Sequence, residues 1–219
     1  ATDCIRRAEP ELARPLALWE KQNNAMKLVA VDARAAGRGL MAGQNLADAR
    51  AQVLDLDARE IDRAGTEALF AAFADWHANA SPLAAVMTES VPYGDLCLDI
   101  TGVSHLFGGE ARMLDRLTGR LEALGFAVSG AIADTVGAAW ALAHFAPGRI
   151  VAADELSDAL AGLPVAALRL TEAQVSGLNQ AGLKQAGQLY GRDRKALMAR
   201  FGASLLMRLD QALGAVEER

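Results

Sequence analysis

The chain has 219 residues, enough for one or two domains with a sizeable core, and 52% of them are hydrophobic but only 5% aromatic. The excess of alanine and leucine favours helices, and the absence of any run of 18 apolar residues or of a basic-apolar N-terminal signal predicts no membrane span and no secretion. Two cysteines give no disulfide framework, so we expect a cytoplasmic protein.

The net charge of −5 argues against nucleic acid as the main partner, but it is unevenly distributed. Residues 161–214 contain seven Lys/Arg and three Asp/Glu, a net charge of +4, which leaves −9 on the rest of the chain. A basic C-terminal module on an acidic body is compatible with weak contact between one end of the protein and a phosphate backbone.

The first part of the chain mixes strand and helix patterns. Residues 15–19 and 27–31 form short strand-like runs on either side of the polar turn Gln22-Asn23-Asn24, which predicts a hairpin. A helix is expected from Asp32 to the glycines at 37–39. The remaining predicted elements are a helix at 45–53, an exposed strand at 54–61, a helix at 64–79, strands at 86–91 and 96–100, a helix at 110–124, a strand at 126–133 and a helix at 134–145, capped by Asp134 or Thr135.

From Leu163 onward only helical patterns occur, separated by Gly182, Gly191 and Gly202. The predicted helices are 172–180, 184–190, 194–201 and 205–213. We place a boundary near 154–162, between a mixed α/β (α+β) body and an all-helical module.

Candidate chemistry centres on the strand at 96–100. Asp95, Cys97 and Asp99 share one face of it. Four residues of strand span about 13 Å, whereas the ions of a two-metal site lie about 4 Å apart. We therefore interpret Asp95 as an exposed acid at the start of the strand, and Asp99, which precedes Thr101 and Gly102, as a brace for the following turn. Cys97 is expected to be a small buried hydrophobe.

Other clusters also favour structural roles. Phe70, Phe73 and Trp76 are three residues apart in the helix at 64–79, a spacing that predicts core packing rather than a ligand site. The three histidines have no metal-ligand spacing.

The stretch Tyr93-Gly94-Asp95-Leu96-Cys97-Leu98-Asp99-Ile100-Thr101-Gly102, followed by Leu106-Phe107-Gly108-Gly109, resembles the central palm strand of Y-family translesion DNA polymerases. Segments 10–18, 33–50 and 130–135 resemble family motifs in the same order, and 163–214 resembles the helical thumb. The resemblance implies a palm at 1–11 and 59–160, fingers at 12–58, a thumb with helix-hairpin-helix-like elements at 161–214, a tail at 215–219 and no little finger.

In that family two Mg²⁺ ions are held by an Asp on the first strand and by an Asp-Glu pair. Gly94 stands where this pair has its Asp, Asp95 stands where it has its Glu, and the first-strand motif would precede Ala1. The resemblance therefore implies no catalytic residue and no cofactor, with Asp95 as the one remaining metal candidate. Mg²⁺ is expected only if the chain is an active polymerase.

The resemblance also identifies candidate contacts. Arg34 matches the fingers arginine and is a candidate nucleotide contact, but Thr135, Ala139 and Ala146 stand where active members commonly have lysine. Arg169-Leu170-Thr171 replaces the thumb's Gly-x-Gly hairpin. The candidate DNA contacts are Arg169, Lys184, Arg192, Arg194, Lys195 and Arg200.

This pattern is similar to the ImuB-like branch of the family, which implies a non-catalytic adaptor in damage-induced (SOS) mutagenesis and translesion synthesis. The implied partners are the sliding clamp, an ImuA-type RecA-like protein, an error-prone replicative-type polymerase and, through the thumb, primer-template DNA. Two alternatives stay open. An active translesion nucleotidyltransferase would show primer extension that Asp95→Ala abolishes. A helical DNA-binding module would retain salt-sensitive binding in residues 161–214 alone.

Overall fold

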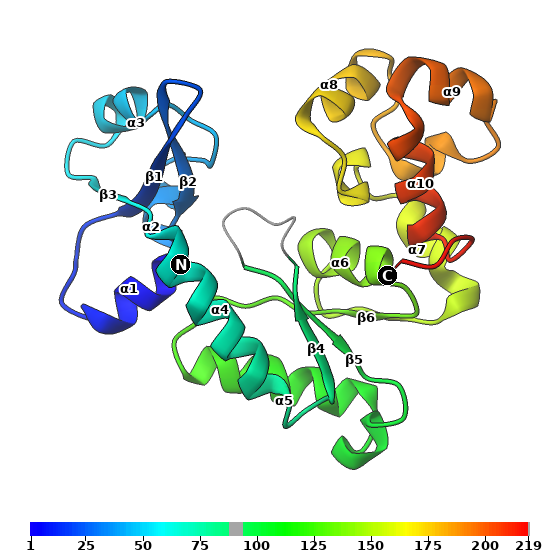
Figure 1. The fold of residues 1–219 in the computed structure, drawn as a ribbon, viewed down its shortest axis with the longest axis horizontal. Coiled ribbons are helices and arrows are strands. Elements are labelled where there is room, and N and C mark those ends of the chain that lie inside the picture. Colours follow the sequence, from blue (N-terminus) through cyan, green and yellow to red (C-terminus); the bar gives the residue numbers. More distant parts are fainter. Residues whose placement is uncertain (88–93, 219) are drawn as a thin grey trace. The chain divides into compact units, whose positions relative to one another are not determined.

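Figure 1 traces the chain through the computed structural model, which describes residues 1–87 and 94–218. Two compact units are present, Ala1–Val103 with Ala123–Ala127 and Ser104–Glu122 with Val128–Arg219. Helices and short strands alternate in the first unit, and helices dominate the second. The predicted mixed α/β class is therefore confirmed. No helix in the described part of the chain has the length and apolarity that crossing a bilayer requires.

The first unit contains a three-stranded sheet with strand order β2-β1-β3. Its strands are β1 (Leu16–Gln22), β2 (Ala25–Val31) and β3 (Asp57–Glu60). β1 and β2 are antiparallel, and both turn residues between them, Asn23 and Asn24, have positive φ, as a tight two-residue hairpin requires. The predicted hairpin is confirmed. β3 pairs in parallel with β1 and is half-buried, so the predicted exposed strand is shorter and better covered than expected.

Three short helices accompany this sheet: α1 (Thr2–Ala8), α2 (Ala33–Gly37) and α3 (Leu46–Gln52). Asp32 is the N-cap of α2 and accepts a hydrogen bond from the Ala35 N–H at 2.8 Å, which explains why the helix begins there. The two predicted helices are confirmed, and α1 was not predicted. The core between α2, α3 and the sheet consists of Ala17, Leu28, Ala35, Leu40, Leu46, Ala49 and Val53.

The rest of the first unit is α4 (Arg63–His77) followed by the antiparallel pair β4 (Leu83–Val86) and β5 (Leu96–Asp99). β5 is the strand predicted at 96–100. It is largely half-buried, and β4 is its one partner among the described residues. Of the strand predicted at 86–91, residues 88–91 lie outside the described residues, as does Tyr93.

The aromatic side chains predicted to pack in the core from α4 contact one another but are only half-buried. The Phe73 ring stacks on Trp76 with centroids 5.8 Å apart and meets Phe70 edge-on at 6.2 Å. Phe126 adds a fourth ring, 5.5 Å from Phe73, and the Ala127 N–H donates to the Asp3 carboxylate at 3.0 Å. These contacts replace strand pairing, so the strand predicted at 126–133 was wrong over most of its length.

The second unit begins with the 3₁₀ turn η1 (Ser104–Phe107) and α5 (Glu110–Ala123), the latter as predicted. β6 (Ile132–Ala133) and β7 (Ile150–Val151) form a two-stranded parallel sheet on either side of α6 (Val136–Phe145). Thr135 is the N-cap of α6, one of the two predicted caps.

The helical module follows. Its elements are η2 (Ala153–Glu155), α7 (Leu156–Ala161), η3 (Val165–Leu168), α8 (Glu172–Gln180), η4 (Ala186–Leu189), α9 (Arg194–Phe201) and α10 (Ala203–Ala212). The predicted helix at 184–190 is only the 3₁₀ turn η4. The side-chain oxygen of Gln188 accepts the N–H groups of Lys184 and Gln185, and a Cβ on Gly187 would lie 2.8 Å from Ala161 Cβ. The segment is therefore held as one tight turn.

α6 and the helical module share a single core. It includes Leu142 of α6, Leu160 of the unpredicted helix α7, Leu178 of α8 and Leu205 of α10. The residues predicted to form a domain boundary therefore include a buried helix. The division into palm, fingers and thumb stays a prediction.

Candidate functional site

Gly94 and Asp95 lie immediately before β5, at the end of the strand where the sequence predicts a degenerate metal site. Gly94 is exposed, but Asp95 is half-buried, so the prediction of an exposed acid at this position was wrong. The backbone carbonyl of Asp95 accepts the Met87 N–H at 3.0 Å, which extends the β4–β5 ladder by one step. The backbone here follows the expected strand, but position 94 offers no side chain to a cation.

The second acid of this strand, Asp99, serves the following turn. Its carboxylate accepts the Thr101 N–H at 2.9 Å, and Gly102 continues the turn with φ +74°. Hydrogen bonds from the Thr101 side chain and backbone lower the pKa of Asp99. The predicted role of Asp99 as a turn brace is confirmed.

The two acids of the β5 region lie too far apart to share a two-metal centre. Within residues 1–87 and 94–218, no group of three or more His, Cys, Asp or Glu side chains is arranged to hold a metal ion. Asp95 and Asp99 are four strand residues apart, about 13 Å, which is several times the separation of the ions in a two-metal site. The acids of this strand therefore cannot together hold two Mg²⁺ ions.

Arg34 lies on α2 and is exposed. Its Nη1 donates to the carbonyl of Ala13 at 2.5 Å and to that of Leu12 at 3.4 Å. The guanidinium thus fixes the loop before β1. Its predicted role as a nucleotide contact stays a prediction.

Thr135, Ala139 and Ala146 stand at the positions where the resemblance places the lysines of active family members. At the first of these positions the side chain makes a structural contact. The Thr135 hydroxyl accepts the Ala138 N–H at 3.0 Å and donates to the Ala212 carbonyl at 2.9 Å. It therefore joins the start of α6 to the end of α10. Ala139 and Ala146 are half-buried, and Ala146 packs against the shared core. None of these three side chains supplies positive charge for a phosphate.

Five of the six predicted DNA contacts of the helical module divide into two groups. Lys184, Lys195 and Arg200 are exposed and have no carboxylate partner recorded in the described structure. Arg200 lies over the Phe201 ring, 5.2 Å from its centroid. The Arg192 Nε donates to the Gln188 carbonyl at 2.6 Å, and Arg194 forms an ion pair with Asp210 at 2.5 Å, which raises the pKa of Arg194.

Arg169 is different because its side chain is only 7% exposed. Its backbone has φ +52°, in the left-handed region that few residues other than glycine adopt. Its Nη2 donates to both carboxylate oxygens of Glu218, at 2.6 and 2.5 Å, and Arg208 donates to the same carboxylate at 2.8 Å. A DNA phosphate would have to displace Glu218 before it reached Arg169.

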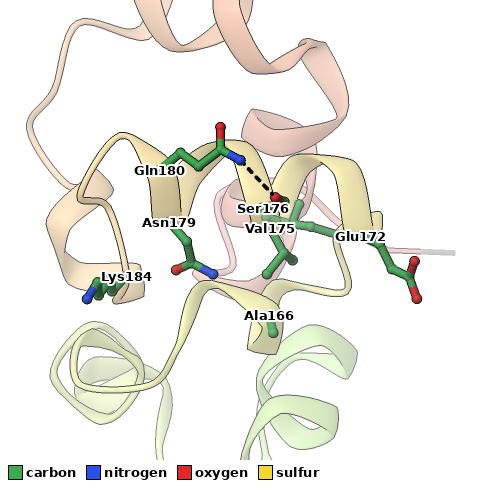
Figure 2. A pocket seen from close by; sticks show the side chains of 8 residues that line it. Ala166, Glu172, Val175, Ser176, Asn179, Gln180 and Lys184 are labelled. Atoms are coloured by element: carbon green, nitrogen blue, oxygen red, sulfur yellow. Dashed lines mark hydrogen bonds between the residues drawn. The ribbon is translucent and has the colours of Figure 1, made fainter. Parts of the chain in front are cut away.

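A shallow groove of about 770 Å³ runs beside α8. Figure 2 shows Val175 and Asn179 pointing from α8 toward Ala166 of η3, while Glu172 points away at the start of the helix. Lys184 lies at the far end, and a 3.3 Å hydrogen bond joins Gln180 to Ser176. The groove combines an apolar floor with polar side chains and one cation.

Sequence reasoning identified Arg169 but missed Arg208, Glu218 and the buried Asp32. Arg169 and Glu218 are 49 residues apart, and no local pattern marks such a pair. Asp32 carried a usable signal, because it precedes the predicted helix at the position of an N-cap.

Comparison with known proteins identifies relatives for most of the chain. A sequence profile of the impB/mucB/samB family matches residues 1–144. Protein ImuB from Caulobacter vibrioides, represented by strains NA1000 / CB15N and ATCC 19089 / CIP 103742 / CB 15, is 46% identical over 181 residues. That alignment covers 82% of this chain but 39% of the relative, so the chain spans about two fifths of the curated relatives that it matches.

Solved structures share the fold at low sequence identity. DinB from Sulfolobus solfataricus has a TM-score of 0.76 at 15% identity, covering 99% of this chain and 64% of that protein. An insertion ternary complex of Dbh DNA polymerase has a TM-score of 0.77 at 16% identity, covering 100% of this chain and 65% of the polymerase. A Y-family DNA polymerase chimera of Dbh and Dpo4 has a TM-score of 0.72.

Proposed function

This chain belongs to the impB/mucB/samB family, and on that premise we propose that it acts as a non-catalytic, polymerase-like subunit in damage-induced mutagenesis and translesion DNA synthesis. Its homology with protein ImuB and its Y-family polymerase fold support the proposal. Work at damaged DNA also implies a cytoplasmic location.

One observation carries the non-catalytic part of the proposal. Gly94 lies just before β5, where the family motif has a metal-binding carboxylate, and the described residues contain no cluster of potential ligands that could replace it. A nucleotidyltransferase needs two cations about 4 Å apart to activate the attacking oxygen and stabilise the leaving oxygen. Thr135 in place of a lysine removes a further charge from the triphosphate side.

A fold retained without this chemistry suits an adaptor. We expect its partners to be the sliding clamp, an ImuA-type RecA-like protein and an error-prone replicative-type polymerase. The likeness to protein ImuB supports this expectation. Because the chain spans only part of its curated relatives, the proposal concerns the complete protein.

Weak DNA contact through the helical module is the second part of the proposal. Lys184, Lys195 and Arg200 are exposed and unpaired with carboxylates in the described structure, so they are available to backbone phosphates. We retain Arg192 and Arg194 as secondary candidates, because each already has a partner within the module.

The test is titration of the protein with dNTP and Mg²⁺, followed by primer extension on the same sample. We expect no metal-dependent nucleotide binding and no extension, from the wild type or from Asp95→Ala. Asp75→Ala, which removes an exposed acid from α4, is the matched control. An active Y-family polymerase assayed in parallel verifies the substrates.

Extension by the wild type that Asp95→Ala abolishes and Asp75→Ala preserves would overturn the non-catalytic assignment. The same protein can then be used to capture purified clamp, RecA-like partner and polymerase. If the protein binds none of the three partners, the adaptor role is refuted even when no primer extension is seen.

A further inference from the structure

Two arginines of the helical module converge on one carboxylate of the tail. Arg169 donates to both oxygens of Glu218, and Arg208 donates to Oε1 at 2.8 Å. The exposed fractions of the three side chains are 7%, 21% and 13% for Arg169, Arg208 and Glu218. The three side chains therefore form an ion-pair group in a largely desolvated position.

The local backbone explains how Glu218 reaches this position. α10 ends at Ala212, and Gly214 adopts φ +78°. The N–H groups of Ala215 and Val216 then both donate to the Asp210 carbonyl, at 2.9 and 3.3 Å. This turn reverses the chain so that the tail runs back along α10 toward Arg208, only ten residues earlier in sequence.

A phosphodiester resembles the Glu218 carboxylate in the features that matter here. Each is a monoanion that offers two terminal oxygens, and guanidinium groups bind either in the same forked geometry. A pair of arginines that holds a carboxylate is therefore also suited to one backbone phosphate. Arg169 follows η3 directly and precedes α8, on the same module as the exposed Lys184, Lys195 and Arg200.

We propose that Arg169 and Arg208 form a phosphodiester-binding pair and that Glu218 occupies it as an internal competitor. In the closed form the Glu218 carboxylate accepts hydrogen bonds from both guanidinium groups. In the open form residues 215–218 turn away at Gly214 and a phosphate takes the place of Glu218. This inference rests on the proposed contact with DNA, not on the proposed lack of catalysis.

The test is binding of a fluorescently labelled single-stranded oligonucleotide by anisotropy across a salt series. Glu218→Gln keeps the shape of the side chain but removes its charge, so the affinity should rise about tenfold, as two charge-assisted contacts allow. The slope of log K against log salt should steepen by about 0.7, the value for one more neutralised phosphate on a single strand. Arg169→Gln added to Glu218→Gln should return both quantities to the wild-type values.

Glu155→Gln is the matched control, because it makes the same charge change at an exposed residue of the same unit with no ion pair recorded. Equal gains from Glu155→Gln and Glu218→Gln would show a general charge effect and overturn the proposal. A Glu218→Gln protein that unfolds more easily in thermal scans without any gain in affinity would identify a purely structural ion pair, and would also overturn it.

A competition assay distinguishes two sources of phosphate, the DNA backbone and a free nucleotide. An abasic oligonucleotide should displace the probe from the Glu218→Gln protein, whereas dATP at the same concentration should not. Displacement by dATP alone would refute the assignment to a DNA backbone. Because none of these assays measures extension or partner capture, loss of this inference leaves the adaptor proposal intact, and extension activity leaves this inference intact.

Discussion

Asp32 shows how one buried side chain can connect several segments. It is 5% exposed and accepts hydrogen bonds from the Arg6 Nε of α1 at 2.8 Å, the Leu16 N–H of β1 at 3.1 Å and the Ala35 N–H of α2 at 2.8 Å. Arg6 in turn donates to the carbonyls of Leu12 and Arg14. The ion pair thus fixes the path of the chain from α1 to the sheet.

Asp32→Ala should therefore destabilise the first unit strongly. It leaves the Arg6 guanidinium and two N–H groups without their acceptor, and breaking such a buried pair typically costs about 3–5 kcal/mol. Chemical denaturation followed by tryptophan fluorescence, to which Trp19 in β1 contributes, measures the effect. The control Asp55→Ala, whose pair with Arg38 is half exposed, should lose no more than about 1 kcal/mol. Equal losses would contradict the assignment of Asp32 as a structural centre.

A second residue-scale prediction concerns pH. Arg63 donates to both oxygens of Glu20, at 2.6 and 2.7 Å, and these bonds, with one from Gln22, lower the pKa of Glu20 from 4.5. A carboxyl whose folded pKa lies below its unfolded pKa adds stability above the unfolded value, and that stability is lost as pH falls through the folded value. The ion pair should therefore stabilise the protein at pH 7 and progressively less below pH 4.5.

Thermal unfolding of wild type and Arg63→Gln between about pH 7 and pH 3 tests this. The difference in melting temperature should be largest at neutral pH and should narrow as Glu20 is protonated. Arg50→Gln on α3, an exposed arginine with no ion pair recorded, should give a small difference that does not change with pH. A pH-independent difference for Arg63→Gln would count against the pair.

At the scale of elements, close approach of α6 and α10 joins α6 to the helical module. A Cβ on Gly137 would lie 3.0 Å from the Cα of Ala212 and 3.2 Å from its Cβ and N. The Thr135 hydroxyl also bonds the Ala212 carbonyl. A side chain at position 137 would force the two helices apart.

Gly137→Ala should therefore destabilise the second unit by about 1–3 kcal/mol through overpacking, although alanine is the better helix former. Gly119→Ala is the internal comparison, because a Cβ at Gly119 in α5 meets no atom within 4 Å. That change should stabilise the protein by up to about 1 kcal/mol. Urea denaturation curves of both variants measure the sign of the change in the free energy of unfolding. An increase in that free energy for Gly137→Ala would disprove the close packing.

The sequence was a good guide to elements with strong periodicity or clear caps and a poor guide to short ones. The helices α8 and α9 have the predicted limits, because a threonine or an aspartate caps their first turns. The segment at 184–190 has helical composition, yet it is limited to one turn by a contact of Gly187 with Ala161, which lies outside any sequence window. Tertiary packing overrides local propensity in such cases.

The candidate site divides in the same way. Asp99 was interpreted correctly as the brace of the turn after β5, because its place before Thr101 and Gly102 is a local signal, whereas the role of Gly94 stays a prediction. Arg169 was identified as a candidate DNA contact, but its burial against Glu218 depends on residues after α10 that the helical pattern does not describe. Ion pairs between residues far apart in sequence depend on the tertiary structure, so composition and local spacing do not predict them.

For the whole molecule, charge is the property that most affects a nucleic-acid partner. The chain carries −5 overall, so binding to DNA should be weak and strongly salt-dependent.

Replacing Lys184 and Lys195 with glutamine should lower the slope of log K against log salt by about 1.4, because each neutralised phosphate of a single strand contributes about 0.7. Exchanging Lys21 and Arg50 of the first unit for glutamine is the matched control and should leave the slope unchanged. Equal effects of the two pairs would show that the helical module is not the DNA-binding surface.

The hairpin of β1 and β2 has a consequence for the order in which the molecule folds. Asn23 and Asn24 already favour the left-handed turn, and the register begins with the immediate neighbours Gln22 and Ala25. Hairpins close in about 1–10 μs, far faster than pairings that must close a long loop. β3 must close a loop of some forty residues to pair with β1, from Leu16 to Asp57, so we expect the hairpin to form first and to serve as the template on which the third strand is added.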